Sequence, residues 1–300
     1  MPNTVAIVGI NGALGKPIFD ALTTTFKSKV QLPVRAVSRD TSKLTSNDLV
    51  KYYGAANKEQ YKAAFEGVDV VVDLRNPAHI KTPNDPVVNA AAEQHVKVFV
   101  PSNFGSDFTV TTYGAAIQPK IDSGNEAKAL GLKVVDIDTG LFLDWVYGVI
   151  ANPQFLSIDI EKELYSRPGD GETKIAVSFL PDIGNYVASA VTKPLDELPT
   201  HLRVYSAITT HNEVAALYEK GKGITLKLEP VSKQSVLDTA TEILNRGITG
   251  FIDFRDVLKG ANLQGANDFS KSKDNEYLNP GLFKTGDFKS VALAAWSKKD

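Results

Sequence analysis

Three glycines near the N-terminus stand at the spacing of a phosphate-binding turn. Gly9, Gly12 and Gly15 follow the apolar run at residues 5–8, and apolar residues at helical spacing begin after Lys16. Free backbone N–H groups at the start of a helix, together with the positive end of the helix dipole, attract anions. The pattern therefore predicts a pyrophosphate site. Its expected contacts are Gly9, Asn11, Gly12, Ala13, Leu14 and Gly15.

The spacing of these glycines differs from the common dinucleotide fingerprint. Gly-x-x-Gly-x-x-Gly stands here in place of Gly-x-Gly-x-x-Gly. An ordinary strand, turn and helix without a ligand is the alternative interpretation. A buried strand before the glycines and a helix after them both fit the pattern, and the fingerprint requires both. We therefore favour a dinucleotide site.

Two cations follow the second predicted strand, which covers residues 33–38. They are Arg39 and Lys43, with Asp40 between them. In a dinucleotide site the end of this strand reaches the adenosine ribose, where an acidic residue selects NAD and an arginine accepts the 2′-phosphate of NADP. Asp40 stands one place beyond the acidic position, and surface charges without a ligand are the alternative. The sequence predicts NADP(H), with Arg39 and Lys43 at the phosphate.

Strands and helices alternate along the first half of the chain. Beyond the segments above, strands are expected over residues 49–53, 68–74, 96–100 and 133–137, and helices over residues 58–65, 85–95 and 120–130. Such alternation is typical of an α/β fold. It predicts a Rossmann-type, doubly wound parallel sheet.

The second half of the chain has a less regular pattern. Helices are expected over residues 182–191, 211–220, 235–244 and 287–296, strands over 202–206 and 224–229, and a solvated loop or flap over the polar stretch 267–276. We expect an NADP-binding domain over residues 1–150 and a smaller substrate-binding lobe over residues 151–300. The two are expected to be partly interwoven, with residues from about 180 to 206 returning to the main sheet.

The composition excludes several classes of function. The 300 residues include no cysteine, which excludes disulfides and thiolate chemistry, and a net charge of −2 offers no basic surface for nucleic acid. The four histidines have no paired metal-ligand spacing, so no metal is expected. Each histidine is expected to lie at the surface or to make a structural hydrogen bond. The first predicted strand follows the N-terminal residues directly, so no signal or transit segment is expected. No apolar stretch is long enough to span a bilayer. We expect a cytoplasmic monomer or homodimer that acts on a small molecule.

A second stretch carries a resemblance to a known family. Pro101-Ser102-Asn103-Phe104-Gly105 resembles the Pro-Ser-Glu-Phe-Gly segment of the NmrA-like and isoflavone-reductase-like atypical short-chain reductases, with Asn103 in place of the glutamate. Lys120 and Gly131 stand eleven positions apart, as that family's lysine and glycine do, and Phe142 matches a family phenylalanine. The variant glycine spacing at residues 9–15 is also similar to that of atypical short-chain reductases. The resemblance covers most of residues 4–145.

The resemblance implies a reductase that binds NADPH. In it, Lys120 would donate or accept a proton, Ser102 and Phe104 would border the nicotinamide, and Asn76 and Pro77 would line the same pocket. The lysine suits this role, since an ammonium near the reacting bond stabilises growing negative charge and supplies a proton. A solvated lysine at an exposed helix end is the alternative.

Departures from the family pattern keep a second function open. The Tyr-x-x-x-Lys pair of short-chain dehydrogenases is missing from its expected place after Ser102. Tyr218 and Lys222 have the same spacing, which we interpret as chance. Tyr113 remains a minor candidate for the proton donor. Gly124 stands where the isoflavone-reductase branch has an arginine. We expect an NADPH-dependent reductase of a small apolar or aromatic carbonyl, enone or imine. The alternative is a non-catalytic, NADP(H)-sensing regulatory protein that acts through a protein partner.

Overall fold

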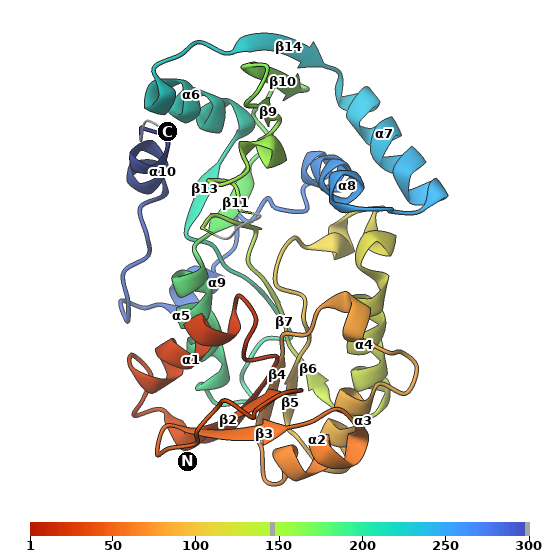
Figure 1. Ribbon diagram of the computed structural model, residues 1–300, viewed down its shortest axis with the longest axis vertical. Coiled ribbons are helices and arrows are strands. Elements are labelled where there is room, and N and C mark those ends of the chain that lie inside the picture. Colours follow the sequence, from red (N-terminus) through yellow and green to blue (C-terminus); the bar gives the residue numbers. More distant parts are fainter. Residues whose placement is uncertain (145–147, 298–300) are drawn as a thin grey trace.

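Six parallel strands form the main sheet of the computed structural model, which describes residues 1–144 and 148–297 (Figure 1). In spatial order they are β3 (Val50–Gly54), β2 (Val30–Ser38), β1 (Asn3–Val8), β4 (Val70–Asp73), β5 (Val98–Val100) and β6 (Lys133–Val134). The order 3-2-1-4-5-6 is that of the Rossmann fold, and it reverses direction between β1 and β4. The predicted fold class is confirmed.

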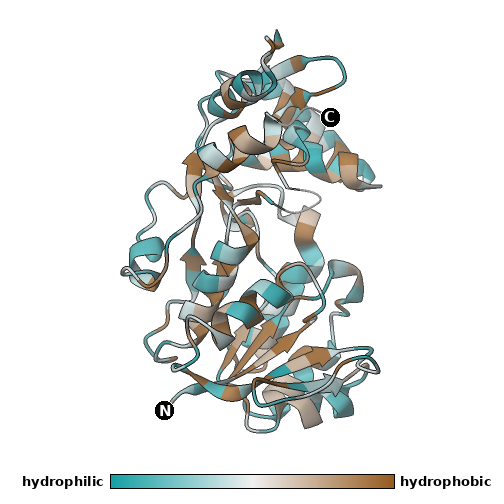
Figure 2. Ribbon diagram, turned by 60° about the vertical axis from the view of Figure 1, so that its left-hand side comes forward, coloured by the Kyte–Doolittle hydropathy of each residue, from teal (hydrophilic) through white to brown (hydrophobic). Residues whose placement is uncertain are grey.

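Helices cover both faces of this sheet. The crossovers are α1 (Gly15–Thr23), α2 (Lys58–Phe65), α3 (Pro86–Glu93) and α4 (Gln118–Ala129), and α5 (Leu180–Val191) joins α1 on its face. Because both faces are covered, β4 and β5 are buried along their whole length. Figure 2 shows these strands mostly in the brown of hydrophobic residues.

Alternate side chains of each strand point to opposite faces and enter different cores. Ile7 and Val72 pack with Ile18 of α1 and Tyr186 of α5. On the other face the core is built by residues of β1, β4, β5, α2, α3 and α4, among them Ala6, Val71, Phe99, Phe65, Val87 and Ala127. The period of two along each strand therefore separates the α1–α5 layer from the α2–α3–α4 layer.

A second lobe lies beyond the carboxyl ends of the main strands, at the top of Figure 1. It contains two small sheets. One consists of β9 (Ile158–Asp159), β10 (Leu164–Pro168) and β14 (Lys227–Val231). The other consists of β8 (Leu141–Phe142), β11 (Ile175–Ser178) and β13 (Ala207–Thr209). Its helices are α6 (His211–Lys222), α7 (Lys233–Arg246), α8 (Phe251–Leu263) and α10 (Phe288–Trp296), which share a separate hydrophobic core.

The chain passes between the two lobes more than once. After β7 (Asp136–Asp138) it enters the second lobe, and it returns to the main lobe to form α5 and β12 (His201–Arg203). β12 pairs in parallel with β7, and α9 (Asp274–Leu278) packs against α5. No helix among the described residues is long and apolar enough to cross a membrane.

The prediction of a solvated loop or flap over residues 267–276 is correct only in part. Half of its residues are exposed, but Asn267 and Phe269 are buried, and the Asn267 amide donates to Ser106 Oγ at 2.9 Å. Asp274 accepts a hydrogen bond from the backbone of Arg203 at 2.7 Å. The stretch is therefore a surface segment that is anchored to distant parts of the chain.

The contact between α1 and α5 depends on a glycine. A Cβ atom on Gly184 of α5 would lie 2.4 Å from the backbone oxygen of Pro17 in α1. By contrast, a Cβ on Gly124 of α4 would lie 3.9 Å from its nearest neighbour, which is an ordinary contact distance. The two helical glycines therefore offer a matched comparison.

We expect Gly184→Ala to lower the free energy of unfolding by roughly 1–3 kcal/mol, because backbone must move to admit the methyl group. Gly124→Ala should raise it by roughly 0.5–1 kcal/mol, since alanine loses less backbone entropy on forming a helix. Urea denaturation of both variants measures the difference. Equal effects in the two variants would contradict the steric explanation.

Candidate functional site

One large cavity runs along the carboxyl ends of the main strands and continues beneath the second lobe. Its volume is about 1320 Å³, which exceeds that of most single-ligand pockets. It opens where the strand order reverses, the position at which open parallel sheets bind ligands. Every site residue predicted from the sequence lines this cavity except Gly15.

The turn between β1 and α1 is folded back tightly on itself. Gly12 N–H donates to Gly9 O at 2.9 Å, and Gly9 has a positive φ of 85°. A Cβ on Gly15 would lie 1.9 Å from Ile10 O, so Gly15 is buried within the turn and serves its packing. Leu14, at the N-cap of α1, makes no side-chain cap hydrogen bond. Gly15 N–H donates to Gly12 O at 3.1 Å, but the backbone N–H groups of Ala13 and Leu14 make no backbone hydrogen bond among the described residues and are left for a ligand in the cavity.

Two exposed cations stand at the rim of the cavity beyond β2. Arg39 and Lys43 make no ion pair with any residue that the structure describes. Asp40 lies between them in sequence but makes no ion pair with either among the described residues, and its carboxylate accepts a hydrogen bond from Ser42 N at 2.9 Å. Hydrogen bonds from Ser42 lower the pKa of Asp40 and keep it ionised. The rim therefore presents two cations without an ion-pair partner and one carboxylate.

A buried ion cluster holds the loop that follows β4. The Arg75 guanidinium lies between the carboxylates of Asp73 and Asp85, with a contact of 2.8 Å to each. Burial opposes its charge, but the two carboxylates raise the pKa of Arg75 above its usual value. Ser102 Oγ donates to Arg75 O at 2.9 Å and links this loop to the one after β5. The sequence analysis missed Arg75, although both of its partners, Asp73 and Asp85, lie nearby in the sequence.

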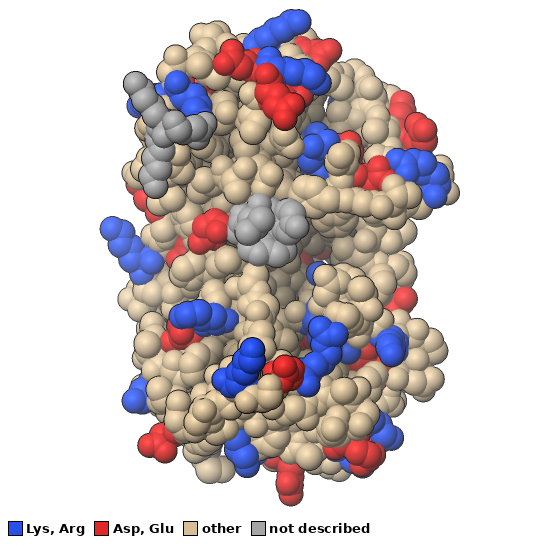
Figure 3. Space-filling view, in the orientation of Figure 1, with Lys and Arg blue, Asp and Glu red and all other residues tan. Residues whose placement is uncertain are grey.

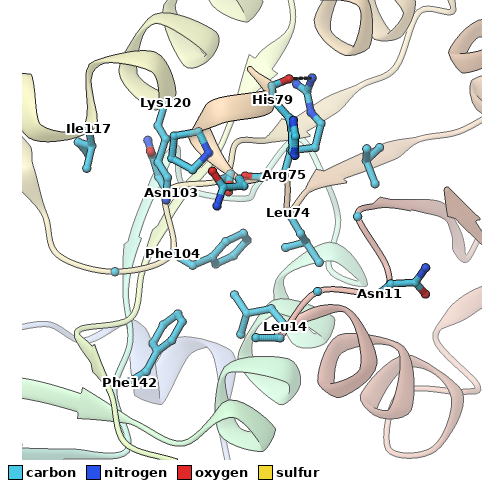
Figure 4. Close-up of a pocket in the computed structure, with 18 of the residues that line it drawn as sticks. Asn11, Leu14, Leu74, Arg75, His79, Asn103, Phe104, Ile117, Lys120 and Phe142 are labelled. Atoms are coloured by element: carbon cyan, nitrogen blue, oxygen red, sulfur yellow. Dashed lines mark hydrogen bonds between the residues drawn. The ribbon is translucent and has the colours of Figure 1, made fainter. Parts of the chain in front are cut away.

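The same loop presents Asn76 and Pro77 to the cavity. Asn76 Oδ1 accepts a hydrogen bond from Ala78 N at 2.9 Å and caps the short 3₁₀ helix Pro77–His79. Figure 4 shows Arg75 bonded to the backbone of His79, with Leu74 facing the cavity. Local capping and the ion cluster together fix the position of these two residues.

Lys120 points into the cavity from the first turn of α4. Its ammonium group makes no hydrogen bond or ion pair with the part of the chain that the structure describes. Burial lowers the pKa of Lys120 to about 8, although the charges of Asp73 and Asp138 act in the opposite direction. Such a lysine is not a solvated helix end, and it can exchange a proton near neutral pH.

Apolar side chains fill the wall opposite the turn. Phe104 is 8% exposed, and in Figure 4 its ring faces the same space as Leu14 and Phe142. Farther from the turn, the lining is aromatic and aliphatic and comes mostly from the second lobe: Phe108, Ile117, Leu141, Val149, Phe155, Phe251, Phe254 and Leu258. None of these side chains carries a charge.

Helix α8, which supplies three of these residues, was missed by the sequence analysis. Phe251, Phe254 and Leu258 are spaced three and four residues apart and share one face of the helix. That helical spacing was the available signal. Their place at the cavity, however, follows from tertiary packing of α8 over the carboxyl ends of the strands.

Tyr113 is wrong as a candidate proton donor. Its side chain is 2% exposed and its hydroxyl donates to Leu237 O at 3.1 Å, outside the cavity. Tyr218 packs its ring 5.3 Å from that of Trp296, in the core of the second lobe. The Tyr218 and Lys222 spacing is therefore a chance match.

The histidines differ in part from the expected arrangement. Neither ring nitrogen of His211 has a hydrogen-bond partner among the described residues, although its side chain is fully buried. Burial lowers the pKa of His211 to about 3 and keeps the ring neutral. His211 is therefore neither a surface residue nor a hydrogen-bonded one.

His201 belongs to a cluster that the sequence spacing did not reveal. Ligand atoms of Asp107, Asp138 and His201 lie within 4.8 Å of one another, in a grouping that could hold a metal ion. However, Arg203 bonds Asp107 Oδ2 at 2.6 Å, and His201 Nε2 bonds Asp138 Oδ2 at 2.5 Å. The carboxylates thus already have cationic or hydrogen-bonding partners. Burial raises the pKa of Asp138 to about 6, and its hydrogen bond raises the pKa of His201.

The strand order and the glycine turn at its reversal point define a protein of the Rossmann-type dinucleotide-binding class. Within this class the chain belongs to the NmrA-like family, whose family model matches residues 1–258. The family expected from the residues around Phe104 and Lys120 is thereby confirmed.

Known relatives are similar over most of the chain. An isoflavone reductase homolog, A622 of Nicotiana glauca, is 24% identical over 254 residues, which are 79% of this chain and 80% of the relative. A crystal structure of isoflavone reductase superposes with a TM-score of 0.74 at 21% identity, over 97% of this chain and 99% of the other. The complex of leucoanthocyanidin reductase from Vitis vinifera with NADPH gives 0.70 at 18% identity, over 98% and 100% of the two chains.

The pair of Asp138 and His201 predicts a pH-dependent stability. Both groups have a higher pKa in the folded chain, so the folded state binds more protons than the unfolded state. Each group therefore contributes fully to the free energy of unfolding below its unfolded pKa, which is 3.8 for Asp138 and 6.5 for His201. The contribution is lost as the pH rises through the higher pKa that the group has in the folded chain.

We expect the free energy of unfolding to fall less steeply with rising pH in the Asp138→Asn, His201→Gln double variant than in the wild type. Guanidinium denaturation at intervals from about pH 4 to 8 measures the two slopes. Identical slopes would show that the pair takes up no protons on folding.

Proposed function

We propose that this chain is an NADPH-dependent reductase of a small apolar or aromatic carbonyl, enone or imine. The observation that carries the proposal is the unpaired ammonium of Lys120 in the cavity that the glycine turn opens. Similarity to reductases, one of which has a solved structure with NADPH bound, supports the same function. The visible face in Figure 3 mixes acidic and basic side chains.

The lining of the cavity fits NADP(H) from one end to the other. Backbone N–H groups near Gly12 and Leu14 would hold the pyrophosphate, and Gly9, Asn11 and Ala13 complete that wall. Arg39 and Lys43 would hold the 2′-phosphate, since both are free of protein partners among the described residues. When bound, the coenzyme supplies the hydride.

The nicotinamide end would lie between the two loops that the Arg75 cluster fixes. Ser102 and Phe104 border it on one side, and Asn76 and Pro77 on the other. Phe104 and Phe142 keep water from this part of the cavity. The uncharged lining supplied by η4 (Pro153–Leu156) and α8 favours an apolar or aromatic substrate, because burying a charged substrate there would leave its charge unpaired.

Lys120 would complete the reduction of the polarised double bond. As the carbon forms its new C–H bond, the π electrons move to the oxygen or nitrogen, or to the far carbon of an enone. The ammonium of Lys120 stabilises this negative charge and then transfers a proton from Nζ to that atom. A pKa of about 8 leaves most Lys120 side chains protonated at pH 7 and able to release the proton.

The second candidate is a non-catalytic NADP(H) sensor that acts through a protein partner. It is favoured by the short set of candidate acid–base groups, since Tyr113 is turned away and bonded to Leu237. A sensor needs the coenzyme site but not Lys120. The two functions therefore separate on the behaviour of a Lys120 variant.

In the wild type we expect NADPH oxidation with at least one class from a panel of aromatic carbonyls, enones and imines. Lys120→Met should lower turnover by about 10²–10⁴-fold while NADPH affinity changes little, because general acid catalysis contributes on this order. Lys97→Met removes an exposed lysine of a surface ion pair and serves as the control. NADPH binding without turnover of any class would favour the sensor.

Arg39→Ala should weaken NADPH binding by about 10- to 100-fold and leave NADH binding nearly unchanged, since a charge-assisted contact to the 2′-phosphate is lost. Calorimetric titration with both coenzymes gives the ratio of affinities. Lys51→Ala, an exposed cation on β3 outside the cavity lining, is the matched control. An unchanged ratio in Arg39→Ala would mean that another residue reads the phosphate.

A further inference from the structure

Asn103, on the loop after β5, lines the same cavity as Lys120. Its Nδ2 donates to Asp136 Oδ1 at 2.8 Å. A carboxylate can only accept in such a bond, so this contact fixes which amide atom is nitrogen and turns Oδ1 away from Asp136. The side chain is thereby held in one orientation.

The Oδ1 atom of Asn103 is buried and has no hydrogen-bond donor among the described residues. An unsatisfied buried carbonyl costs about 1–3 kcal/mol, so a donor is expected nearby. Asn103 and Lys120 line the same cavity and are both labelled in Figure 4. Their elements are neighbours, because a Cβ on Gly124 of α4 would lie 3.9 Å from Pro101 Cγ, two residues before Asn103. Lys120 Nζ carries three N–H donors and has no acceptor in the described structure. Each group lacks what the other provides.

We propose that Asn103 is the positioning residue of Lys120: its Oδ1 accepts a hydrogen bond from Nζ and directs the ammonium toward the substrate end of the cavity. The inference rests on the proposed reductase function. The four-carbon stem of the lysine side chain is flexible and lets Nζ reorient toward this acceptor.

The surrounding charges explain why a neutral acceptor matters here. Two carboxylates act on Lys120: Asp73 of β4, which is paired with Arg75, and Asp138 of β7, which is bonded to His201. A third, Asp136 of β7, accepts the hydrogen bond from Asn103 and lies 3.8 Å from Lys128. The positive end of the α4 dipole acts against the ammonium. An amide oxygen orients Nζ without adding charge, whereas an ionised glutamate or aspartate would favour the protonated form of Lys120 and hinder release of its proton.

Two substitutions of Asn103 should move the titration of Lys120 in opposite directions. Asn103→Asp adds a carboxylate and should raise the midpoint by roughly one pH unit or more. Asn103→Leu removes the acceptor and should lower it. The readout is the ¹³Cε signal of Lys120 in protein labelled with ¹³C-lysine, assigned by its loss in Lys120→Arg, and it needs neither substrate nor coenzyme.

Asn185→Asp is the matched control. Asn185 also has a buried Oδ1 without a partner among the described residues, but it lies on α5, on the opposite face of the sheet from α4. It should leave the Lys120 titration unchanged. If Asn103→Leu does not fold, Asn103→Ala replaces it.

The proposal is overturned if both Asn103 variants leave the Lys120 midpoint where it is, or shift it in the same direction. It gains support if the alkaline limb of the pH–rate profile for NADPH oxidation also moves upward in Asn103→Asp. Because the titration is read on the coenzyme-free protein, its failure is separate from a failure of the reductase assignment, which appears as absent turnover in the wild type.

Discussion

The close approach of backbone to backbone at the β1–α1 turn is the constraint on which the rest of the structure depends. Gly15 lies against Ile10, Gly9 against Leu74, and on the far side of α1 Gly184 lies against Pro17. These contacts leave no room for a side chain, and they set the position and direction of α1. The backbone N–H groups of Ala13 and Leu14, which line the cavity and have no backbone partner among the described residues, are consequently held in place before any ligand arrives, which reduces the cost of ordering a bound anion.

Charge is arranged differently inside the protein and at the site. Buried carboxylates have partners: Asp73 and Asp85 share Arg75, and Asp107 bonds Arg203. Three cations that line the cavity, in contrast, have no ion-pair partner among the described residues. Arg39 and Lys43 at one end and Lys120 at the other are therefore available to a ligand that carries phosphates and to a substrate that develops negative charge. A chain of net charge −2 thus presents a locally positive cavity.

The sequence predicted most of the main lobe because its signals there are local. Buried strands, a glycine turn and helical spacing each lie within about ten residues, and parallel strands bring their carboxyl ends to one edge. That geometry brought Asn76, Ser102 and Lys120 to one cavity although they are far apart in the chain. The failures are non-local. The polar stretch 267–276 is anchored by bonds to Ser106 and Arg203, and α8 reaches the cavity only through packing of the second lobe.

The repeated crossing of the chain between lobes has an evolutionary consequence. β12 supplies a strand beside β7, and residues 267–278 bond back to the main lobe, so neither lobe is a contiguous piece of sequence. Recombination that exchanged a C-terminal segment would sever paired strands and uncover their edges. Diversification of ligand preference on this scaffold is therefore expected to proceed through point changes on surfaces such as α8, and not through the shuffling of modules.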